Sequence, residues 1–426
     1  MKKTFFLILS VMTVTLSASA VTVYSIVNNS NITTVPENET SYSSKIVADK
    51  LPDDHHSENS FSEISKPSVN NKISVNDCDI NVRDRVYCGK FTEPRLKVEY
   101  NGKKLVKDND YCVVYDSTED KGAGRYSLTV KMTGEYEGSI KKEYNILPAG
   151  ISYYSVSSKV NSITFSWNDK KDGADGFEIL YSTSSDMSNP ESIIINGCNS
   201  REYTFGGLEQ NTKLYIKIRT IKNTGLQNEN DVLYSSWSNI ISAETKKVEV
   251  IDGVTYIDGI IVVNKTYSLP ESYGDGLQDC ALEAFEKMAE SASEDGLYLE
   301  IVSGFRSYYT QACVYENFCY ERGQTNADRV SARPGHSEHQ TGLAMDINST
   351  SFAFSYTPEA KWLAENCYKY GFIIRYPEEK ESITGYSYES WHLRYLGKEL
   401  AGKLYKSGET LEEYLGITSV YDESGG

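Results

Sequence analysis

The period of the apolar residues changes once along this chain, and that change constrains the fold more than any other feature. Across residues 77–148 and 150–247, apolar and polar side chains alternate in short runs between turns rich in Gly and Asn. This alternation predicts two all-β modules. In residues 250–420, apolar residues recur at helical spacing, as in Leu282 and Phe285, between strand-like runs. A chain of 426 residues is long enough for several cores, and we expect two β sandwiches followed by an α+β domain.

The first residues have the order of a secretory signal. Residues 2–20 run from two Lys through an apolar stretch to Ala-Ser-Ala. This order predicts a signal peptide within residues 1–27 and a secreted, extracellular or cell-envelope location. Because apolar residues continue weakly to Ile26, the alternative is a segment that stays as a membrane anchor. Residues 28–76 are rich in Ser and Asn and poor in apolar residues, which predicts a disordered stalk.

Charge and cysteine content exclude some classes of protein. The formal net charge of -17 repels nucleic acid, so we expect no nucleic-acid partner. The eight Cys are spread unevenly and none belongs to a CxxC pair. We therefore assign no disulfide, leave the cysteine pairing open, and expect no cysteine-rich zinc site.

The first β region resembles a known kind of module. Residues 77–148 are similar to the small bacterial Ig-like repeats of exported surface proteins, on the strength of Asp110-Tyr111 and the Gly-Tyr turn at 134–138. The resemblance implies a spacer or a wall-binding element without chemistry of its own.

The second β region, 150–247, resembles a fibronectin type III domain. The similar residues are strand-like runs such as 163–167 and the ending Ser235-Ser236-Trp237-Ser238. We expect Trp167, Leu208 and Tyr215 to be core residues, as in such sandwiches. The alternative is an exposed aromatic site that holds sugars.

The last region contains predicted helices with clear ends. One helix begins near Leu282 and ends before Gly296, and a second covers 309–322 and stops at Gly323. A third begins at Thr357-Pro358, a cap followed by proline in the first turn, and ends at Gly371. The predicted strands are 297–302, 342–347, 372–376 and 389–396.

A first segment with candidate metal-binding or catalytic side chains runs from Ser337 to Asp346. It places His339 on a Gly-punctuated turn and Asp346 on the strand that follows. Strand alternation directs Met345 to one face of the sheet and Asp346 to the other. A buried carboxylate needs a partner, which could be an arginine in a structural ion pair or a metal ion.

A second segment, 388–395, contains another histidine and another carboxylate. Alternation places His392 and Arg394 on one face, and Glu389 stands three residues before the histidine. Together the two segments supply two histidines, an inward aspartate and a glutamate. A catalytic zinc needs this set: three N/O ligands, an open position for water, and a general base.

The order of these motifs resembles the VanY-type D-alanyl-D-alanine carboxypeptidases over residues 259–415. The motifs are Ser303-Gly304-Phe305-Arg306-Ser307, Gln311, Ser337-x-His339-x-x-Gly342-x-Ala344-x-Asp346 and Glu389-x-Trp391-His392-x-Arg394-Tyr395. The resemblance implies one Zn²⁺ held by His339, Asp346 and His392, with Glu389 as catalytic base. It further implies Arg306 beside the scissile carbonyl and substrate-binding roles for Arg306, Gln311, Ser337 and Trp391. Ser390 departs from the proline that many relatives have there, which could loosen the turn but removes no catalytic atom.

The expected function is that of an exported, monomeric zinc metallopeptidase. It would hydrolyse the C-terminal D-alanyl-D-alanine bond of peptidoglycan stem peptides, with Glu389 activating the water. Three alternatives remain at this stage: an L,D-carboxypeptidase that acts on tetrapeptide stems, an endopeptidase that cuts inside cross-links, and a non-catalytic wall-binding protein. His336, next to the motif, is expected to be a loop residue and not a fourth ligand. Arg333 and Arg394 would either brace carboxylates or contact substrate.

Overall fold

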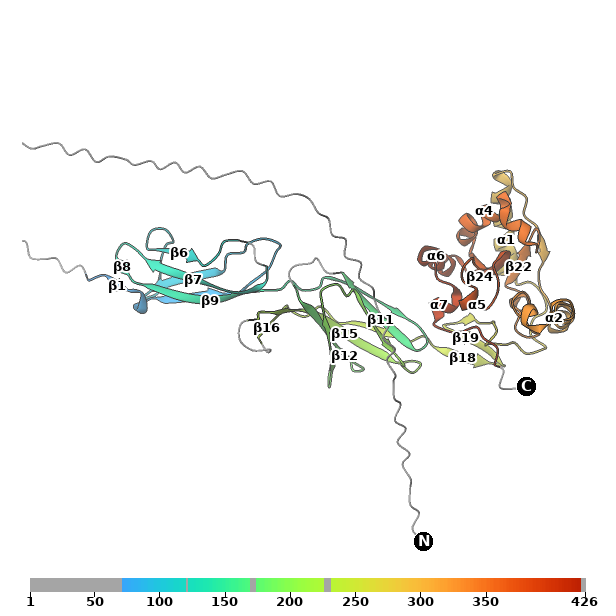
Figure 1. The fold of residues 1–426 in the computed structure, drawn as a ribbon, viewed down its shortest axis with the longest axis horizontal. Coiled ribbons are helices and arrows are strands. Elements are labelled where there is room, and N and C mark those ends of the chain that lie inside the picture. Colours follow the sequence, from blue (N-terminus) through green and yellow to red (C-terminus); the bar gives the residue numbers. More distant parts are fainter. Residues whose placement is uncertain (1–70, 120–121, 169–173, 226–230, 423–426) are drawn as a thin grey trace, which may run out of the picture. The chain divides into compact units, whose positions relative to one another are not determined.

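The computed structural model describes residues 71–119, 122–168, 174–225 and 231–422, drawn as a ribbon in Figure 1. The predicted signal peptide or anchor lies outside these residues, as does the predicted stalk up to residue 70. Within the described ranges, no helix combines the length and apolar character needed to cross a membrane.

The first module is built from strands in three sheets, as the alternation predicts. The sheet orders are β3-β9-β7-β6, β2-β4-β5 and β1-β8. Val98, Leu105, Leu128 and Val130 are buried in its core. The strands are β1 (Ile73–Ser74), β2 (Asp79–Arg83), β3 (Arg85–Val86), β4 (Arg95–Tyr100), β5 (Lys103–Lys104), β6 (Tyr111–Tyr115), β7 (Gly124–Met132), β8 (Tyr136–Glu137) and β9 (Ser139–Leu147).

The boundary between the predicted stalk and this module needs a correction. Ile73 and Ser74 pair with Tyr136 and Glu137, and the side chain of Val75, in the 3-10 helix η1 (Val75–Asp77), is buried. Residues 73–76 therefore belong to the module and not to the stalk. A two-residue strand is too short to give an alternating pattern, so the sequence did not reveal it.

The second module contains two sheets of the orders β10-β11-β14 and β13-β12-β15-β16, with β17 also paired to β15. Trp167 is buried in its core, and Leu208 packs against that core. The strands are β10 (Tyr153–Ser158), β11 (Ser162–Asn168), β12 (Gly176–Ser182), β13 (Glu191–Asn196), β14 (Glu202–Gly206), β15 (Lys213–Asn223), β16 (Val232–Tyr234) and β17 (Ile241–Glu244).

The prediction that Tyr215 is a core residue is wrong. Its neighbours Leu214 and Ile216 are buried in the core, and side chains along β15 alternate between the two faces. Tyr215 therefore lies on the outer face, where Lys213 Nζ is 5.9 Å from its ring centroid.

The C-terminal domain combines helices and strands, as expected from the change of period. The strands are β18 (Val248–Ile251), β19 (Val254–Ile257), β20 (Ile260–Ile261), β21 (Ile301–Ser303), β22 (Ala344–Ile347), β23 (Phe372–Tyr376) and β24 (Glu389–Tyr395). The α-helices are α1 (Asp279–Glu294), α2 (Tyr308–Arg322), α3 (Gln324–Ala327), α4 (Pro358–Asn366), α5 (Glu381–Thr384), α6 (Lys398–Ser407) and α7 (Leu411–Leu415). The 3-10 helices are η2 (Glu338–Thr341), η3 (Phe352–Tyr356) and η4 (Cys367–Tyr370).

The sheet β21-β22-β24-β23 gives this domain one apolar face and one polar face. Met345, Ile347 and Leu393 point to the apolar face and pack with residues of α1 and α4, which lie beside β22 and β24 in Figure 1. Because side chains alternate along a strand, Asp346 and His392 point to the opposite face. The core of the domain therefore fixes the strands that carry two of the predicted ligands.

Local capping chemistry explains where α2 ends and α4 begins, as predicted. The third predicted helix, up to Gly371, consists of α4 followed by the 3-10 helix η4. The side chain of Thr357 accepts a hydrogen bond from the backbone N–H of Ala360, and Pro358 occupies the first turn of α4. Gly323 closes α2, as expected. The predicted strand 297–302 is only partly correct, because β21 starts at Ile301, and of the four residues before it only Leu299 is buried.

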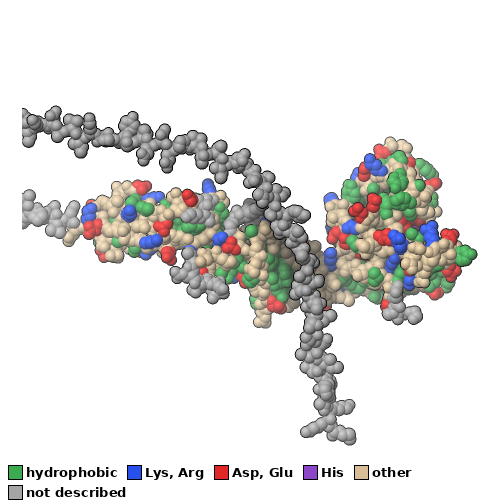
Figure 2. Space-filling view, in the orientation of Figure 1, with side chains coloured by type: hydrophobic (Ala, Val, Ile, Leu, Met, Phe, Trp, Pro, Cys, Tyr) green, Lys and Arg blue, Asp and Glu red, His purple; other side chains and the backbone are tan. Residues whose placement is uncertain are grey.

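The surface carries charges of both signs. Figure 2 shows acidic and basic side chains interspersed among polar and apolar ones on the face in view. All eight cysteines fall in the described ranges, and each is a free thiol.

Candidate metal centre

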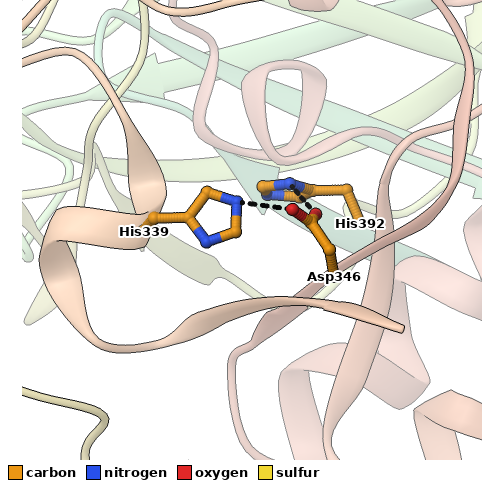
Figure 3. Close-up of side chains that lie close together, drawn as sticks. All are labelled: His339, Asp346 and His392. Atoms are coloured by element: carbon orange, nitrogen blue, oxygen red, sulfur yellow. Dashed lines mark hydrogen bonds and ion pairs between the residues drawn. The ribbon is translucent and has the colours of Figure 1, made fainter. Parts of the chain in front are cut away.

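The three predicted ligands meet on the polar face of the sheet (Figure 3). His339 comes from η2, Asp346 from β22 and His392 from β24, and all three side chains are buried. His339 Nε2 lies 3.2 Å from Asp346 Oδ2, and His392 Nδ1 lies 3.1 Å from Asp346 Oδ1. One donor atom from each residue lies within 4.8 Å of the other two. Such a cluster can offer three N/O ligands to a single ion.

Backbone geometry brings the ligands together. Asp346 and His392 are direct partners in the antiparallel ladder between β22 and β24. His339 reaches the same point because Gly342, with φ +69°, turns the chain from η2 into β22. A side chain at position 342 would be strained at this φ and would collide with the carbonyl of Gly276. The glycine of the motif is thus needed for the turn.

The hydrogen bonds of His339 prepare one ring nitrogen for a metal. Its Nδ1 lies 2.7 Å from the carbonyl oxygen of Gly304, so the proton on Nδ1 is donated there. The lone pair then stays on Nε2, the nitrogen that faces Asp346.

The charges of the cluster favour a cation at its centre. Burial by itself raises the pKa of the Asp346 carboxyl, but His339 and His392 hold that pKa well below its usual range. Burial lowers the pKa of His392, whereas Asp346 and Glu338 oppose burial and raise the pKa to about 9. The buried cluster therefore attracts positive charge, which a divalent ion supplies. Donor types, spacing and charge all fit the predicted zinc ion.

Glu389 lies beside the ligands at the start of β24. Its Oε2 is 3.8 Å from His392 Nδ1, and 14% of its side chain remains exposed. Burial raises the pKa of the Glu389 carboxyl to about 8, with Asp346 adding to the rise and His392 and Arg306 opposing it. A carboxyl with a raised pKa next to a metal site is suited to proton transfer.

Arg306 approaches the cluster from the segment between β21 and α2. Its Nη2 donates to Ser303 Oγ at 2.8 Å and lies 3.7 Å from Asp346 Oδ2, while its Nη1 donates to Gln311 Oε1 at 2.8 Å. Gln311 is itself held, because its Nε2 donates to Ser331 Oγ at 3.2 Å and to the carbonyl of Ala332 at 2.7 Å. Gln311 therefore positions the guanidinium of Arg306.

One cavity of about 600 Å³ collects every site residue predicted from the sequence. Ser337 and Trp391 line it together with the ligands, Glu389, Arg306 and Gln311. The aromatic residues Phe318, Phe352, Tyr376 and Tyr388 form much of the remaining wall. The substrate roles predicted for Gln311, Ser337 and Trp391 stay predictions.

Sequence reasoning missed Glu338, which lies between Ser337 and His339. Its carboxylate is buried, and Oε1 accepts hydrogen bonds from Arg375 Nε and Arg394 Nη1, both at 2.8 Å. Burial opposes ionisation, but the two guanidiniums hold the pKa of Glu338 well below its usual range. Of the two roles left open for Arg394, the structure shows the bracing of a carboxylate. A hint in the sequence was Arg375 within the otherwise apolar strand 372–376.

Neighbouring polar residues have structural partners. His336 Nδ1 lies 2.8 Å from the carbonyl of Asn264, which agrees with a loop residue and not a fourth ligand. Arg333 forms an ion pair with Asp328, with Nη2 and Oδ2 2.9 Å apart.

Ser390, which departs from the family pattern, is buried, and its hydroxyl is 2.9 Å from that of Ser355 in η3. Ser390 lies in β24 and not in a turn, and this contact connects the strand to η3.

Comparison with known proteins agrees with this site. The VanY family, described as D-alanyl-D-alanine carboxypeptidase, matches residues 275–398. YodJ of Bacillus subtilis (strain 168), a carboxypeptidase by name, is 39% identical over 219 residues, which cover 45% of this chain and 79% of YodJ.

Two solved structures are also similar. The LdcB LD-carboxypeptidase is 41% identical, with a TM-score of 0.39, and the match covers 41% of this chain and 98% of LdcB. A mutant of the vancomycin resistance D,D-pentapeptidase VanY, in complex with Zn(II), is 36% identical, with a TM-score of 0.34 and coverage of 36% and 97%. With its ligand cluster, its cavity and a relative matched over most of its length, this chain belongs to the VanY family of D-alanyl-D-alanine carboxypeptidases.

Proposed function

We propose that this protein is an exported zinc carboxypeptidase that hydrolyses the C-terminal D-alanyl-D-alanine bond of peptidoglycan stem peptides. The observation that carries the proposal is the convergence of three buried ligands, Glu389 and Arg306 on one cavity. Membership of the VanY family supports the substrate class.

The residues of the site divide the chemistry between them. His339 Nε2, Asp346 and His392 Nδ1 would hold the zinc ion. When bound, zinc acts as a Lewis acid, lowers the pKa of a water molecule towards about 7 and favours the ionised form of a nearby carboxyl. Glu389 takes the proton of the attacking water and later gives it to the leaving amine. Arg306, fixed by Ser303 and Gln311, stabilises the negative charge that develops on the scissile carbonyl oxygen.

The test is mass spectrometry of a muramyl pentapeptide and a muramyl tetrapeptide incubated with the purified full-length chain. We expect release of D-alanine from the pentapeptide with zinc, and its loss when a chelator removes the metal. Cleavage of the tetrapeptide alone would move the assignment to an L,D-carboxypeptidase, which could use the same ligands and base. A product that retains both terminal residues would indicate an endopeptidase, and no cleavage of either peptide would favour a wall-binding protein.

Arg306→Lys is expected to lower kcat by about 10²–10³-fold, as the loss of an oxyanion donor does. A lysine has a single ammonium group and cannot reproduce the fixed fork held by Ser303 and Gln311. Steady-state kinetics on the pentapeptide measure the effect. The control is Arg329→Lys, because Arg329 forms an exposed ion pair with Glu381 and should leave kcat unchanged. Equal rates for Arg306→Lys and the wild type would contradict the role of Arg306.

The remaining parts of the chain fit the same proposal. The sheets of the second module, β10-β11-β14 and β13-β12-β15-β16, suit a fibronectin type III sandwich, and the first module suits a bacterial Ig-like one. Both would act as spacers or wall-binding elements of a monomeric protein outside the cytoplasm. The N-terminal residues 1–27 would direct export.

A further inference from the structure

A buried ion network lies directly behind the ligand His392. It contains the side chains of Glu338, Arg375, Arg394 and Glu412, of which at most 1% is exposed. Arg375 donates to Glu338 Oε1 through Nε at 2.8 Å and to Glu412 through Nη1 at 2.8 Å and Nη2 at 2.5 Å. Arg394 also donates to Glu338 Oε1, at 2.8 Å, and to the carbonyl of Ile261 at 2.7 Å. The two positive guanidiniums and the two negative carboxylates give the network no net charge, although all four charged groups are buried.

The network leaves one oxygen of Glu338 without a hydrogen bond. Both guanidiniums bind Oε1, whereas Oε2 is buried and has no hydrogen-bond partner among the described residues. The same holds for Nε2 of His392, also buried. These two atoms face each other at 3.7 Å, which is about 0.7 Å longer than a typical hydrogen bond.

The chemistry of imidazole connects this contact to the metal site. His392 presents Nδ1 to Asp346 and the ligand cluster. For Nδ1 to offer a lone pair to a metal, the proton of the neutral ring must lie on Nε2. A buried N–H needs an acceptor, and the facing acceptor is Glu338 Oε2. Since Oε1 is fixed by two arginines, the carboxylate cannot easily turn away.

We propose that Glu338 is a positioning residue for the metal site: it accepts the Nε2 proton of His392 and so holds that ring with Nδ1 free to bind zinc. The inference rests on the zinc site proposed above. Arg375 and Arg394 orient Glu338 by binding its Oε1, which leaves Oε2 for His392.

The test compares zinc binding by the full-length chain and three variants. Zinc dissociation constants come from competition with a chelating dye. In Glu338→Gln the arginines occupy the amide oxygen, so an NH₂ group faces His392 Nε2 and favours the wrong tautomer. We expect the dissociation constant to rise about 10–100-fold, as for other outer-shell partners. Glu338→Asp keeps the charge for the arginines but shortens the reach to His392, so zinc binding should weaken while the fold is retained.

Glu412→Gln is the matched control. It removes the same charge from the same network, but Glu412 contacts Arg375 and Asn264 and not His392. If the role of Glu338 is purely structural, Glu338→Gln and Glu412→Gln should lower the melting temperature by similar amounts. The two variants should then also have similar zinc affinities. The proposal predicts a loss of zinc affinity, and an altered spectrum of the cobalt-substituted protein, in the Glu338 variants only. Wild-type affinity in folded Glu338→Gln and Glu338→Asp would overturn it.

A measurement on the wild type avoids any folding defect of the variants. In a ¹⁵N-histidine-labelled, zinc-loaded chain, NMR should show His392 with a proton on Nε2 and none on Nδ1. Nε2 without a proton would overturn the proposal. Because zinc affinity and tautomer are read without substrate, a protein that binds zinc normally but cleaves no stem peptide would contradict only the proposed function.

Discussion

Glu389→Gln is expected to lower kcat for pentapeptide cleavage by about 10²–10⁴-fold, the usual contribution of a general base. Glutamine keeps the size of the side chain but cannot take a proton from water. Glu389 belongs to none of the three ligand positions, so zinc should stay bound at one ion per chain. The effect is measured by product formation under saturating peptide, with zinc content determined on the same samples.

The control for this variant is Glu365→Gln, which removes a carboxylate from the exposed surface of α4, away from the cavity. Its kcat should equal that of the wild type. A Glu389→Gln protein that has lost its zinc would show that the residue is a ligand, and one with wild-type kcat would assign the base to another group.

Arg375→Met is expected to lower the free energy of unfolding of the C-terminal domain by about 3–5 kcal/mol. Methionine fills part of the volume but leaves Glu338 and Glu412 as buried carboxylates that have lost a shared cation. An unpaired buried charge is costly, whereas the intact pair is not by itself a large source of stability. Thermal and urea unfolding, followed through the transition of this domain, measure the change.

Lys380→Met provides the comparison, because Lys380 pairs with Glu413, the neighbour of Glu412, at 2.9 Å but with about 30% of the lysine side chain exposed. An exposed pair contributes about 0–1 kcal/mol, so this variant should unfold close to the wild type. Equal losses of unfolding free energy in the two variants would show that burial of the ion pairs does not set the cost of removing one partner.

The parts of the site that follow from short-range rules were predictable from the sequence. Strand alternation placed Asp346 on the face opposite Met345 and His392 on the face opposite Leu393, and a capping threonine followed by Pro358 located the start of α4. Both rules act over a few residues, so a single sequence contains all the information they need.

Features that depend on distant partners were not predictable in this way. Glu338 lies on a single 3-10 turn without a readable period, and its role depends on Arg375 and Glu412, which only the fold brings near. The outward position of Tyr215 was missed because aromatic character alone does not reveal the face of a strand. Ile73 joined the first module through a short pairing with β8 that leaves no pattern in the sequence.

The pairing of β22 with β24 has a consequence for how activity reports on folding. On these strands, core residues and metal ligands occupy alternate positions, with Met345 opposite Leu393 and Asp346 opposite His392. A slip of one residue between the strands would turn Leu393 towards the metal site and His392 into the apolar core. A misaligned chain would thus lose its ion and its packing together. The amount of bound zinc in a sample therefore reports the fraction of molecules in which β22 and β24 have the native register.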